Sequence, residues 1–538
     1  MNGSGDDVIS AASPERVPGD FFGTSSAASP VGPTTLHRVD REAGVVSRRA
    51  VLLGSSAAVG LLAGGAYATG RNTPTASVDP LATPLDSWRR AAGPPYFIAH
   101  RGAGAVVPEH TLEGYQAALA WGAKCLEVSV AMTADNVLIC MHDLTYDRTT
   151  SVSGVIAEKP STVLARARVD IPRLGPRWQG DRRPMIPLLS EVLEAVGTRA
   201  VLCLEAKNDA AFEPMLALVR RNGLTDSVFA KLHLPARTRV KQAHAAGIPI
   251  FMYAGSAAEL TADVLGPVVR SLNPEHDVLV LPAPTNDRGV DDATIRRVVA
   301  MGVPVWMHPV TRRGEAARLS ELGVQGFVTP DIAYLARTLP PQRADNWAVG
   351  AMTSGQLTAN PYSNGYALRW SDQESLTLDF KNRPSFVLLG QLCPIARPEQ
   401  TYSLDVEVRF DRLPRDPRAH CSIAFAHETD EYYEHQKSGA PGYHAILRAD
   451  GELGIYAHHG RPGPGEPVSG IVRTPPLVAG EWTRLRLRVT PQTLTWERPG
   501  APPATADDAR WRGGYLHVGR SGPDGPLSLR KLRVNVTQ

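Results

Sequence analysis

The segment that decides the fold occupies residues 96–102 and reads Tyr96-Phe-Ile-Ala-His-Arg-Gly. A short apolar run comes first, and a histidine and an arginine follow it directly. Similar runs recur down the chain, separated by stretches of roughly ten residues that carry apolar residues at helical spacing. The runs are Tyr96–His100, Cys125–Val130, Ala200–Glu205, Val228–Leu232, Pro249–Tyr253, Val278–Leu281, Val303–His308 and Gly326–Thr329.

The stretches between these runs predict helices. Four of them end at a glycine, which is common just after a helix C-terminus. These four are Thr111–Trp121, Ala236–Ala246, Asp292–Met301 and Glu315–Leu322. Eight strand-then-helix units over residues 95–340 predict an α/β fold, a (β/α)8 TIM barrel. An open, doubly wound parallel sheet is the alternative at the level of the fold.

A barrel of this kind carries its chemistry at the C-terminal ends of its strands. Polar residues at or near the predicted strand ends are His100, Arg101, Glu127, Ser129, His142, Glu205 and Lys207. Imidazoles carry protons near neutral pH, and an arginine can donate to two phosphate oxygens at once. Two carboxylates at one barrel mouth repel each other unless a cation lies between them, and oxygen ligands favour Ca²⁺ or Mg²⁺. The pattern therefore predicts acid/base chemistry on a bound anion.

Short motifs in this region also follow one another in a set order. They are Phe97-Ile-Ala-His-Arg-Gly-Ala-Gly, Pro108-Glu-His-Thr, Leu126-Glu-Val-Ser-Val, His142-Asp, Leu204-Glu-Ala-Lys and Gly323-Val-Gln-Gly-Phe-Val-Thr-Pro-Asp. In this order they resemble the glycerophosphodiester phosphodiesterase family over about residues 95–340. The resemblance implies a (β/α)8 barrel that hydrolyses phosphodiesters with one bound divalent cation, Ca²⁺ or Mg²⁺.

The resemblance also implies roles for individual side chains. His100 and His142 match the two catalytic histidines. One would activate the attack on phosphorus and the other, expected to be His142, would protonate the leaving alkoxide. Arg101 and Lys207 match residues that bind the phosphate. A histidine beside carboxylates is expected to keep its proton to higher pH, which suits an acid.

The predicted metal ligands depart from the family pattern at one position. Glu127 and Glu205 match two of the ligands, but the family motif Glu-x-Asp on the second strand is Glu127-Val-Ser129 here. A hydroxyl is a neutral and weaker ligand than a carboxylate, so the affinity for a cation is expected to fall, or a water to bridge. Glu109 matches an acidic residue expected to steady the site through Arg101, and Trp306 is expected to form an apolar wall.

The pattern changes after Pro340-Pro341. Residues 341–365 are predicted to be a linker and residues 366–538 an antiparallel β-sandwich, because segments such as Thr401–Phe410 alternate strictly. Several of its segments resemble concanavalin-like lectin or laminin-G-like domains, which implies binding to a glycan or a cell-envelope surface. The candidate contacts are Tyr432, Tyr433, His458 and His459, with loop residues that bind no ligand as the alternative.

The N-terminus has the pattern of an export signal. Residues 1–68 combine a segment predicted to be disordered with Arg48-Arg49, an apolar run and Ala66-Tyr-Ala. This resembles a twin-arginine signal and predicts export to the cell envelope or outside, with an uncleaved anchor as an alternative. Residues 69–94 are predicted to be a linker.

The net charge of the chain gives no support for binding to nucleic acid. The chain has 57 Lys+Arg against 54 Asp+Glu, a formal net charge of +3, so no basic field points to nucleic acid. The first hypothesis is an exported phosphodiesterase that cleaves glycerophosphodiesters into an alcohol and glycerol 3-phosphate. The second is a phospholipase D-like enzyme that acts on lipid or an envelope polymer. The third is a non-catalytic protein that binds glycans or phosphate, for which Ser129 is the main support.

Overall fold

The computed structural model describes residues 84–285, 288–352, 354–355, 368–370, 374–379, 385–431 and 440–537. The predicted export signal, most of the first linker and the candidate contacts Tyr432 and Tyr433 lie outside these residues. Within the described part of the chain, no helix has both the length and the apolar character needed to cross a membrane.

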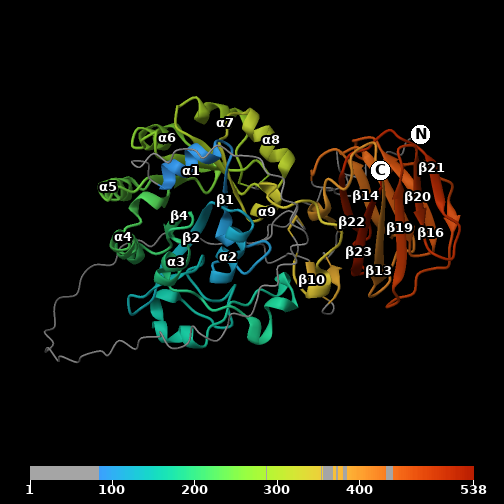
Figure 1. Ribbon diagram of the computed structural model, residues 1–538, viewed down its shortest axis with the longest axis horizontal. Helices are drawn as coiled ribbons and strands as arrows, with labels where there is room; N and C mark the ends of the chain where they lie inside the picture. Colours follow the sequence, from blue (N-terminus) through green and yellow to red (C-terminus); the bar gives the residue numbers. More distant parts are fainter. Residues whose placement is uncertain are drawn as a thin grey trace, which may run out of the picture. The chain divides into compact units, whose positions relative to one another are not determined.

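Eight parallel strands form a closed barrel (Figure 1). They are β1 (Tyr96–Ala99), β2 (Cys125–Met132), β4 (Val201–Ala206), β5 (Val228–His233), β6 (Ile250–Tyr253), β7 (Val278–Pro282), β8 (Val305–His308) and β9 (Gly326–Thr329). Each strand pairs with the next, β9 pairs with β1, and β1 pairs with β2, which closes the ring. The predicted (β/α)8 barrel and its eight strands are confirmed, and closure excludes the open sheet.

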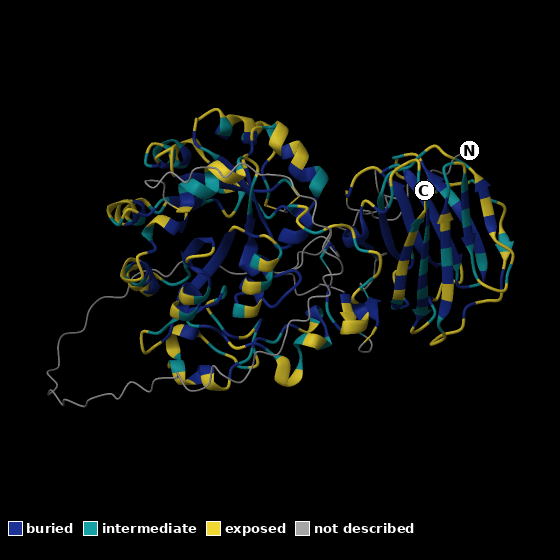
Figure 2. Cartoon of the chain, in the orientation of Figure 1, coloured by how far each residue is buried: buried dark blue, intermediate teal, exposed yellow. Residues whose placement is uncertain are grey.

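Helices cover the outside of the barrel (Figure 1). They are α2 (Leu112–Ala120), α3 (Leu189–Val196), α4 (Phe212–Arg221), α5 (Arg237–Ala245), α6 (Ala262–Val269), α7 (Asp292–Val299), α8 (Arg313–Glu321) and α9 (Ile332–Leu335). The four helices predicted from the sequence correspond to α2, α5, α7 and α8. Figure 2 shows exposed residues on the outer sides of α5, α7 and α8, as expected for amphipathic helices on a barrel.

One part of the predicted linker 69–94 is a helix. α1 (Pro84–Ala92) places Leu85, which is buried, and Trp88 against the first residues of the barrel strands. The linker prediction is therefore wrong for residues 84–92, because two apolar side chains find a surface to cover at the N-terminal end of the barrel. This end, lined by α1 and the strand starts, is called the floor below, and the opposite end is called the mouth.

An excursion between β2 and α3 builds one side of the mouth. β3 (Leu138–Cys140) runs antiparallel to β2, and the backbone N–H of Met141 donates to the carbonyl of Ser129 at 2.9 Å. Because Met141 pairs with Ser129, the next residue, His142, lies near the end of β2. Five short 3-10 turns complete the excursion: η3 (Ile156–Glu158), η4 (Ser161–Ala165), η5 (Pro172–Leu174), η6 (Pro176–Trp178) and η7 (Gly180–Arg182).

The C-terminal third contains two antiparallel sheets, as predicted. One runs in the order β10 (Leu368–Trp370), β11 (Leu376–Leu378), β23 (Leu527–Thr537), β13 (Thr401–Phe410), β19 (Thr483–Val489), β20 (Thr493–Glu497) and β21 (Ala504–Asp507). The other runs β12 (Ser385–Leu388), β22 (Tyr515–Arg520), β14 (His420–His427), β15 (Gly442–Arg448), β16 (Glu452–His458) and β17 (Glu466–Pro467), and β18 (Val472–Arg473) also pairs with β16. Every second residue of β13 is buried, so the period-two pattern faces the core between the sheets.

The second predicted linker, 341–365, is partly built into this sandwich. Trp347 is fully buried, Ala344 forms a bridge with Arg533 of β23, and the backbone N–H of Val534 donates to the carbonyl of Arg343 at 2.8 Å. The linker prediction is therefore wrong for this stretch, because the backbone adds to the edge of β23 and a large indole is removed from water. The lectin-like character of the sandwich stays a prediction.

Candidate active site

A tight turn after β1 holds the first histidine and arginine at the mouth. Arg101, in the turn His100–Gly102, has a positive φ of 54°, and Gly102 follows at 70°. Any Cβ at Gly102 would lie 2.9 Å from the ring of Tyr115, so the turn needs glycine there. The turn aims the backbone N–H of Arg101 at Glu127 Oε2, at 2.9 Å. His100 Nε2 lies 3.7 Å from the same oxygen.

The next strands contribute a row of buried polar side chains. Parallel register aligns Ser129 of β2 with Glu205 of β4, and Glu205 with Lys231 of β5. Glu127, two residues before Ser129, faces the same side of β2. The Lys231 ammonium lies between the two carboxylates, with Nζ 2.5 Å from Glu127 Oε1 and 2.7 Å from Glu205 Oε2. All four side chains are buried inside the barrel.

A chain of alternating charges links the first arginine to the second histidine. Glu109 Oε1 accepts from Arg101 Nη1 at 3.0 Å and from Arg148 Nη2 at 2.7 Å. Arg148 Nε donates to Asp143 Oδ2 at 2.6 Å, and Asp143 Oδ1 lies 2.7 Å from His142 Nδ1. The two arginines hold the pKa of Glu109 well below its usual range, although burial opposes them. The contact between Glu109 and Arg101 that the sequence predicts is present.

Both histidines lose protons more easily than expected. Burial, with a further contribution from Arg101, lowers the pKa of His142 to about 3, and Asp143 offsets only part of this. Burial and the neighbouring His308 and Arg101 lower the pKa of His100 well below its usual value. The expectation that nearby carboxylates keep a histidine protonated to higher pH is therefore wrong for the site without a ligand. Desolvation and cationic neighbours outweigh the carboxylates there.

Lys207, the lysine predicted to bind phosphate, lies beside Glu205 at the mouth. Lys207 Nζ is 3.1 Å from Glu205 Oε1, and its side chain is 17% exposed, so it reaches the open part of the mouth. The same oxygen accepts a hydrogen bond from the hydroxyl of Tyr253 at 2.7 Å. Glu205 is thus engaged by two lysines and one tyrosine.

Trp306 is not a wall of the site. Its side chain is fully buried in the floor, with ring centroids 5.8 Å from those of Tyr96, Phe229 and Phe251. The alternation of β8 turns both Trp306 and His308 inward, and only the later residue reaches the mouth. His308 Nε2 lies 3.1 Å from His100 Nε2.

The residues predicted from the sequence do not include several members of the site, among them His308, Lys231, Arg148 and Tyr253. Lys231 lies within a predicted apolar strand, and a charged residue inside such a run needs a buried partner, which is a signal that could have found it. Arg148 and Tyr253 carry no comparable local signal, because their partners come from residues distant in the sequence.

The residues present do not fit a divalent cation between the predicted ligands. The Lys231 ammonium already lies between the two glutamates, and the third ligand position carries the neutral Ser129. Among the described residues, no cluster of three or more His, Cys, Asp or Glu side chains has the arrangement to hold a metal ion. The predicted Ca²⁺ or Mg²⁺ stays a prediction.

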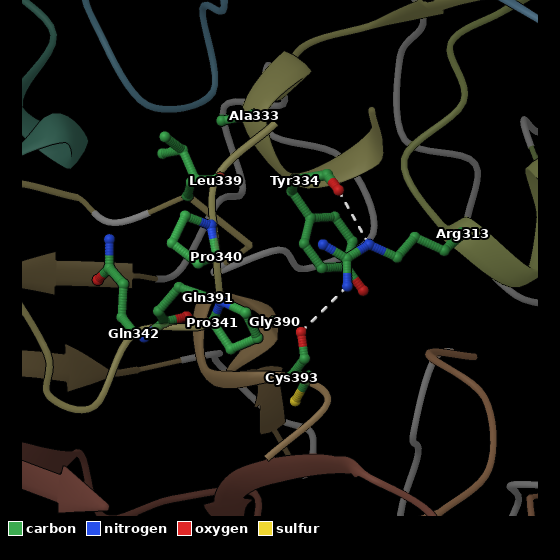
Figure 3. A pocket seen from close by; sticks show the side chains of 11 residues that line it. Arg313, Ala333, Tyr334, Leu339, Pro340, Pro341, Gln342, Gly390, Gln391 and Cys393 are labelled. Carbon is green, nitrogen blue, oxygen red and sulfur yellow. Dashed lines mark hydrogen bonds between the residues drawn. The ribbon is translucent and has the colours of Figure 1, made fainter. Parts of the chain in front are cut away.

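A hollow elsewhere in the described structure has no such chemistry (Figure 3). Figure 3 shows the guanidinium of Arg313 over the ring of Tyr334, beside Pro340 and Gln391. Arg313 donates to the carbonyls of Tyr334 at 2.9 Å and Cys393 at 3.1 Å. Because backbone carbonyls already engage this guanidinium, we assign the hollow a structural role.

The mouth of the (β/α)8 barrel thus gathers imidazole and cationic side chains, an arrangement suited to an anionic ligand. The chain matches the model of the "Glycerophosphoryl diester phosphodiesterase family" over residues 100–333, which run from the turn after β1 into α9. This match agrees with the family that the motifs of the barrel resemble.

Relatives of known sequence and structure are similar to the barrel. "Probable glycerophosphodiester phosphodiesterase 1" of Mycobacterium tuberculosis is 47% identical over 66 residues, which are 12% of this chain and 24% of that protein. The "Glycerophosphodiester phosphodiesterase" of Caldanaerobacter subterraneus subsp. tengcongensis is 27% identical over 44% of this chain and 93% of its own length. A solved phosphodiesterase of Oleispira antarctica, in complex with the product sn-glycerol-3-phosphate, is 18% identical, with 46% of this chain and 98% of that chain covered and a TM-score of 0.39.

Proposed function

We propose that this protein hydrolyses glycerophosphodiesters to an alcohol and glycerol 3-phosphate. The observation that carries the proposal is the convergence of His100, His142 and Arg101 at one barrel mouth, with Lys207 beside them. A phosphodiester is a monoanion whose transition state spreads charge over the phosphoryl oxygens. Fixed cations stabilise that charge, and imidazoles move the protons.

His100 is the group proposed to accept a proton from water. It is neutral before substrate binds, because burial and its cationic neighbours lower its pKa. As the water oxygen forms its bond to phosphorus, the water proton passes to His100. The bond between phosphorus and the alcohol oxygen breaks at the same centre, and phosphorus keeps its oxidation state. Arg101, held by Glu109, donates to the phosphoryl oxygens.

His142 is the group proposed to protonate the leaving oxygen. Asp143 occupies its Nδ1, so Nε2 is the nitrogen left for the substrate. The anionic phosphodiester brings negative charge to the mouth and raises the pKa of His142 from its low value in the ligand-free site. The proton that His142 gives to the alcohol is restored from solvent, and His100 returns its proton to solvent.

Export and surface attachment belong to the same proposal. The twin-arginine pattern at Arg48-Arg49 supports export of the folded protein. The two-sheet architecture of the C-terminal third supports a module that contacts a glycan or the cell envelope. Localisation after expression with and without residues 1–68, and a pull-down on purified envelope, test these two points.

The activity is tested with the full chain and glycerophosphocholine. Release of glycerol 3-phosphate and choline, abolished in His100→Ala, supports the proposal. Phosphatidylcholine is supplied in parallel, because turnover of that lipid alone indicates the phospholipase D-like alternative. Binding of glycerophosphocholine without turnover of either compound indicates the non-catalytic alternative and overturns the proposal.

A further inference from the structure

The inference concerns the position between Glu127 and Glu205, where the family pattern places a cation. We propose that the ammonium of Lys231 supplies the positive charge between Glu127 and Glu205 in place of a divalent cation, so that this protein works without one. The inference deepens the proposed function and rests on it. It goes beyond the motifs, none of which includes Lys231.

The first support is the geometry of the two carboxylates. Lys231 takes one oxygen of each, at 2.5 Å and 2.7 Å. The other oxygen of Glu127 accepts the backbone N–H of Arg101, and the other oxygen of Glu205 accepts from Tyr253 and Lys207. All four carboxylate oxygens are thus engaged by protein donors, and a metal ion would have to displace Lys231 to reach them.

The second support is the charge balance. Three carboxylates around one divalent cation, the family arrangement, leave one net negative charge. Ser129 removes one carboxylate, and Lys231 supplies a single positive charge. Two carboxylates and one ammonium again leave one net negative charge. The loss of the aspartate and the presence of the lysine therefore leave the net charge unchanged. This is expected if the ammonium takes the place of a divalent cation.

The third support is the way in which Lys231 is held. The side chain is only 9% exposed, and Nζ lies 4.8 Å from the centroid of the Tyr253 ring. A buried ammonium is stable only with close partners, and two carboxylates provide them. An ammonium has three N–H donors, so the two carboxylates leave one for a phosphoryl oxygen. Lys231 exchanges no proton in the proposed reaction and acts as a charge and a donor.

The hydroxyl of Ser129 fits the same interpretation. It is fully buried in the row beside Glu205, and its oxygen has no hydrogen-bond partner among the described residues. An aspartate at this position would add a negative charge within the same row. Ser129→Asp combined with Lys231→Ala therefore restores the three carboxylates of the family motif and removes the ammonium that occupies their centre.

The experiment compares four full-length proteins: wild type, Lys231→Ala, the double variant Ser129→Asp/Lys231→Ala, and the control Lys241→Ala. Lys241 is an exposed lysine on α5, outside the mouth. Each protein is treated with EDTA and dialysed, and its far-UV circular dichroism is recorded. Mg²⁺ and Ca²⁺ are then titrated by calorimetry, and glycerophosphocholine turnover is measured with EDTA and with each cation.

The proposal expects wild type and Lys241→Ala to bind neither cation at millimolar concentration and to keep their rate within about twofold in EDTA. Lys231→Ala loses roughly 10²–10³-fold in rate, the loss typical of one fixed charge-stabilising donor. The double variant binds one cation per chain, and whatever rate it has becomes sensitive to EDTA.

Stoichiometric binding of Mg²⁺ or Ca²⁺ by wild type, or loss of its rate in EDTA with recovery on adding a cation, overturns the proposal. The wild-type titration needs no variant, so it decides the matter even if Lys231→Ala does not fold. It also needs no turnover. If no protein hydrolyses glycerophosphocholine, the proposed function fails, while the calorimetry still shows whether the ammonium has replaced the metal.

Discussion

The floor and the mouth of the barrel use the same strands for opposite purposes. On β5, Phe229 packs in the floor and Lys231 lies between two carboxylates in the mouth. On β8, Trp306 packs in the floor and His308 lies beside His100. In both strands the two residues are two positions apart and face the barrel interior. Depth along the strand, and not the face of the strand, separates packing from chemistry.

The two ends also differ in how they contribute to stability. The aromatic rings of the floor stabilise the fold by leaving water, by roughly 25 cal/mol for each Å² of apolar surface. Burying the charged groups of the mouth costs desolvation free energy. Ion pairs such as that of Lys231 with Glu127 offset this cost and add little net stability. A floor residue should therefore matter for stability, and a mouth residue for turnover. The predictions below test this division, from the largest expected effect to the smallest.

The largest effect is expected at the mouth. His142→Asn removes the proposed proton donor and should lower kcat by about 10²–10⁴-fold. The melting temperature should change little, because the side chain is partly exposed and an amide can still meet Asp143. Steady-state kinetics and thermal melting of the same preparation measure both quantities. A variant that keeps its rate would remove His142 from the reaction.

At the floor, a substitution is expected to lower the free energy of unfolding strongly and to leave kcat nearly unchanged. Trp306→Ala leaves a cavity among three aromatic rings and should lower the free energy of unfolding by about 3–5 kcal/mol. The folded fraction should keep kcat within a few-fold. Denaturant unfolding and kinetics at low temperature check this, with Leu144→Ala, at an exposed position, as the control. A large loss of kcat in folded Trp306→Ala would contradict the hypothesis that floor residues affect stability and mouth residues affect turnover.

Acid should lower the stability of the folded protein through His110 and Glu109, two buried groups at the mouth. Burial lowers the pKa of His110 to about 4, so the folded protein stays neutral there while the unfolded chain takes up a proton below about pH 6.5. The unfolded state then binds more protons, and stability falls as the pH drops from about 6.5 toward 4. The depressed pKa of Glu109 acts in the same direction below about pH 4.5. His110 alone should contribute roughly 3 kcal/mol across this range.

Thermal melting between pH 7.5 and 4.5 measures this dependence. His110→Gln keeps a polar group near the hydroxyl of Tyr115, to which His110 is bonded at 2.8 Å, and removes the titration. The melting temperature of His110→Gln should therefore fall less on acidification than that of wild type. Equal slopes for the two proteins would show that His110 is not neutral in the folded state.

The smallest effect is expected at the helix cap beside the mouth. Thr111 Oγ1 accepts the backbone N–H of Gly114 at 3.0 Å and begins α2. Thr111→Ala should lower the free energy of unfolding by about 1 kcal/mol, and Thr111→Ser should restore most of it. Denaturant titration of the three proteins measures the difference. A loss as large as that of Trp306→Ala would mean that the cap also supports the loop that carries Glu109.

The sequence predicted much of the barrel and part of the site. The eight strands follow from apolar runs of β length, and His100, Arg101 and Glu205 could be placed because they follow or end such runs. Lys231 was missed, since its role depends on carboxylates from β2 and β4, which parallel pairing brings beside it. Trp306 was placed at the wrong depth, because a period of two gives the face of a strand but not how far along the barrel each residue lies.

By itself, the sequence determined the (β/α)8 barrel, the antiparallel sandwich and the strand ends that carry histidine, arginine and glutamate. These properties are local: periodicity, glycine at helix ends and short motifs encode them. The tertiary structure alone decided what lies between Glu127 and Glu205, and what holds His142 and Arg101 in one network. These ion pairs depend on the register of strands that are far apart in the chain and on the closure of the barrel. Only the folded structure sets the distances between the charged groups and their burial.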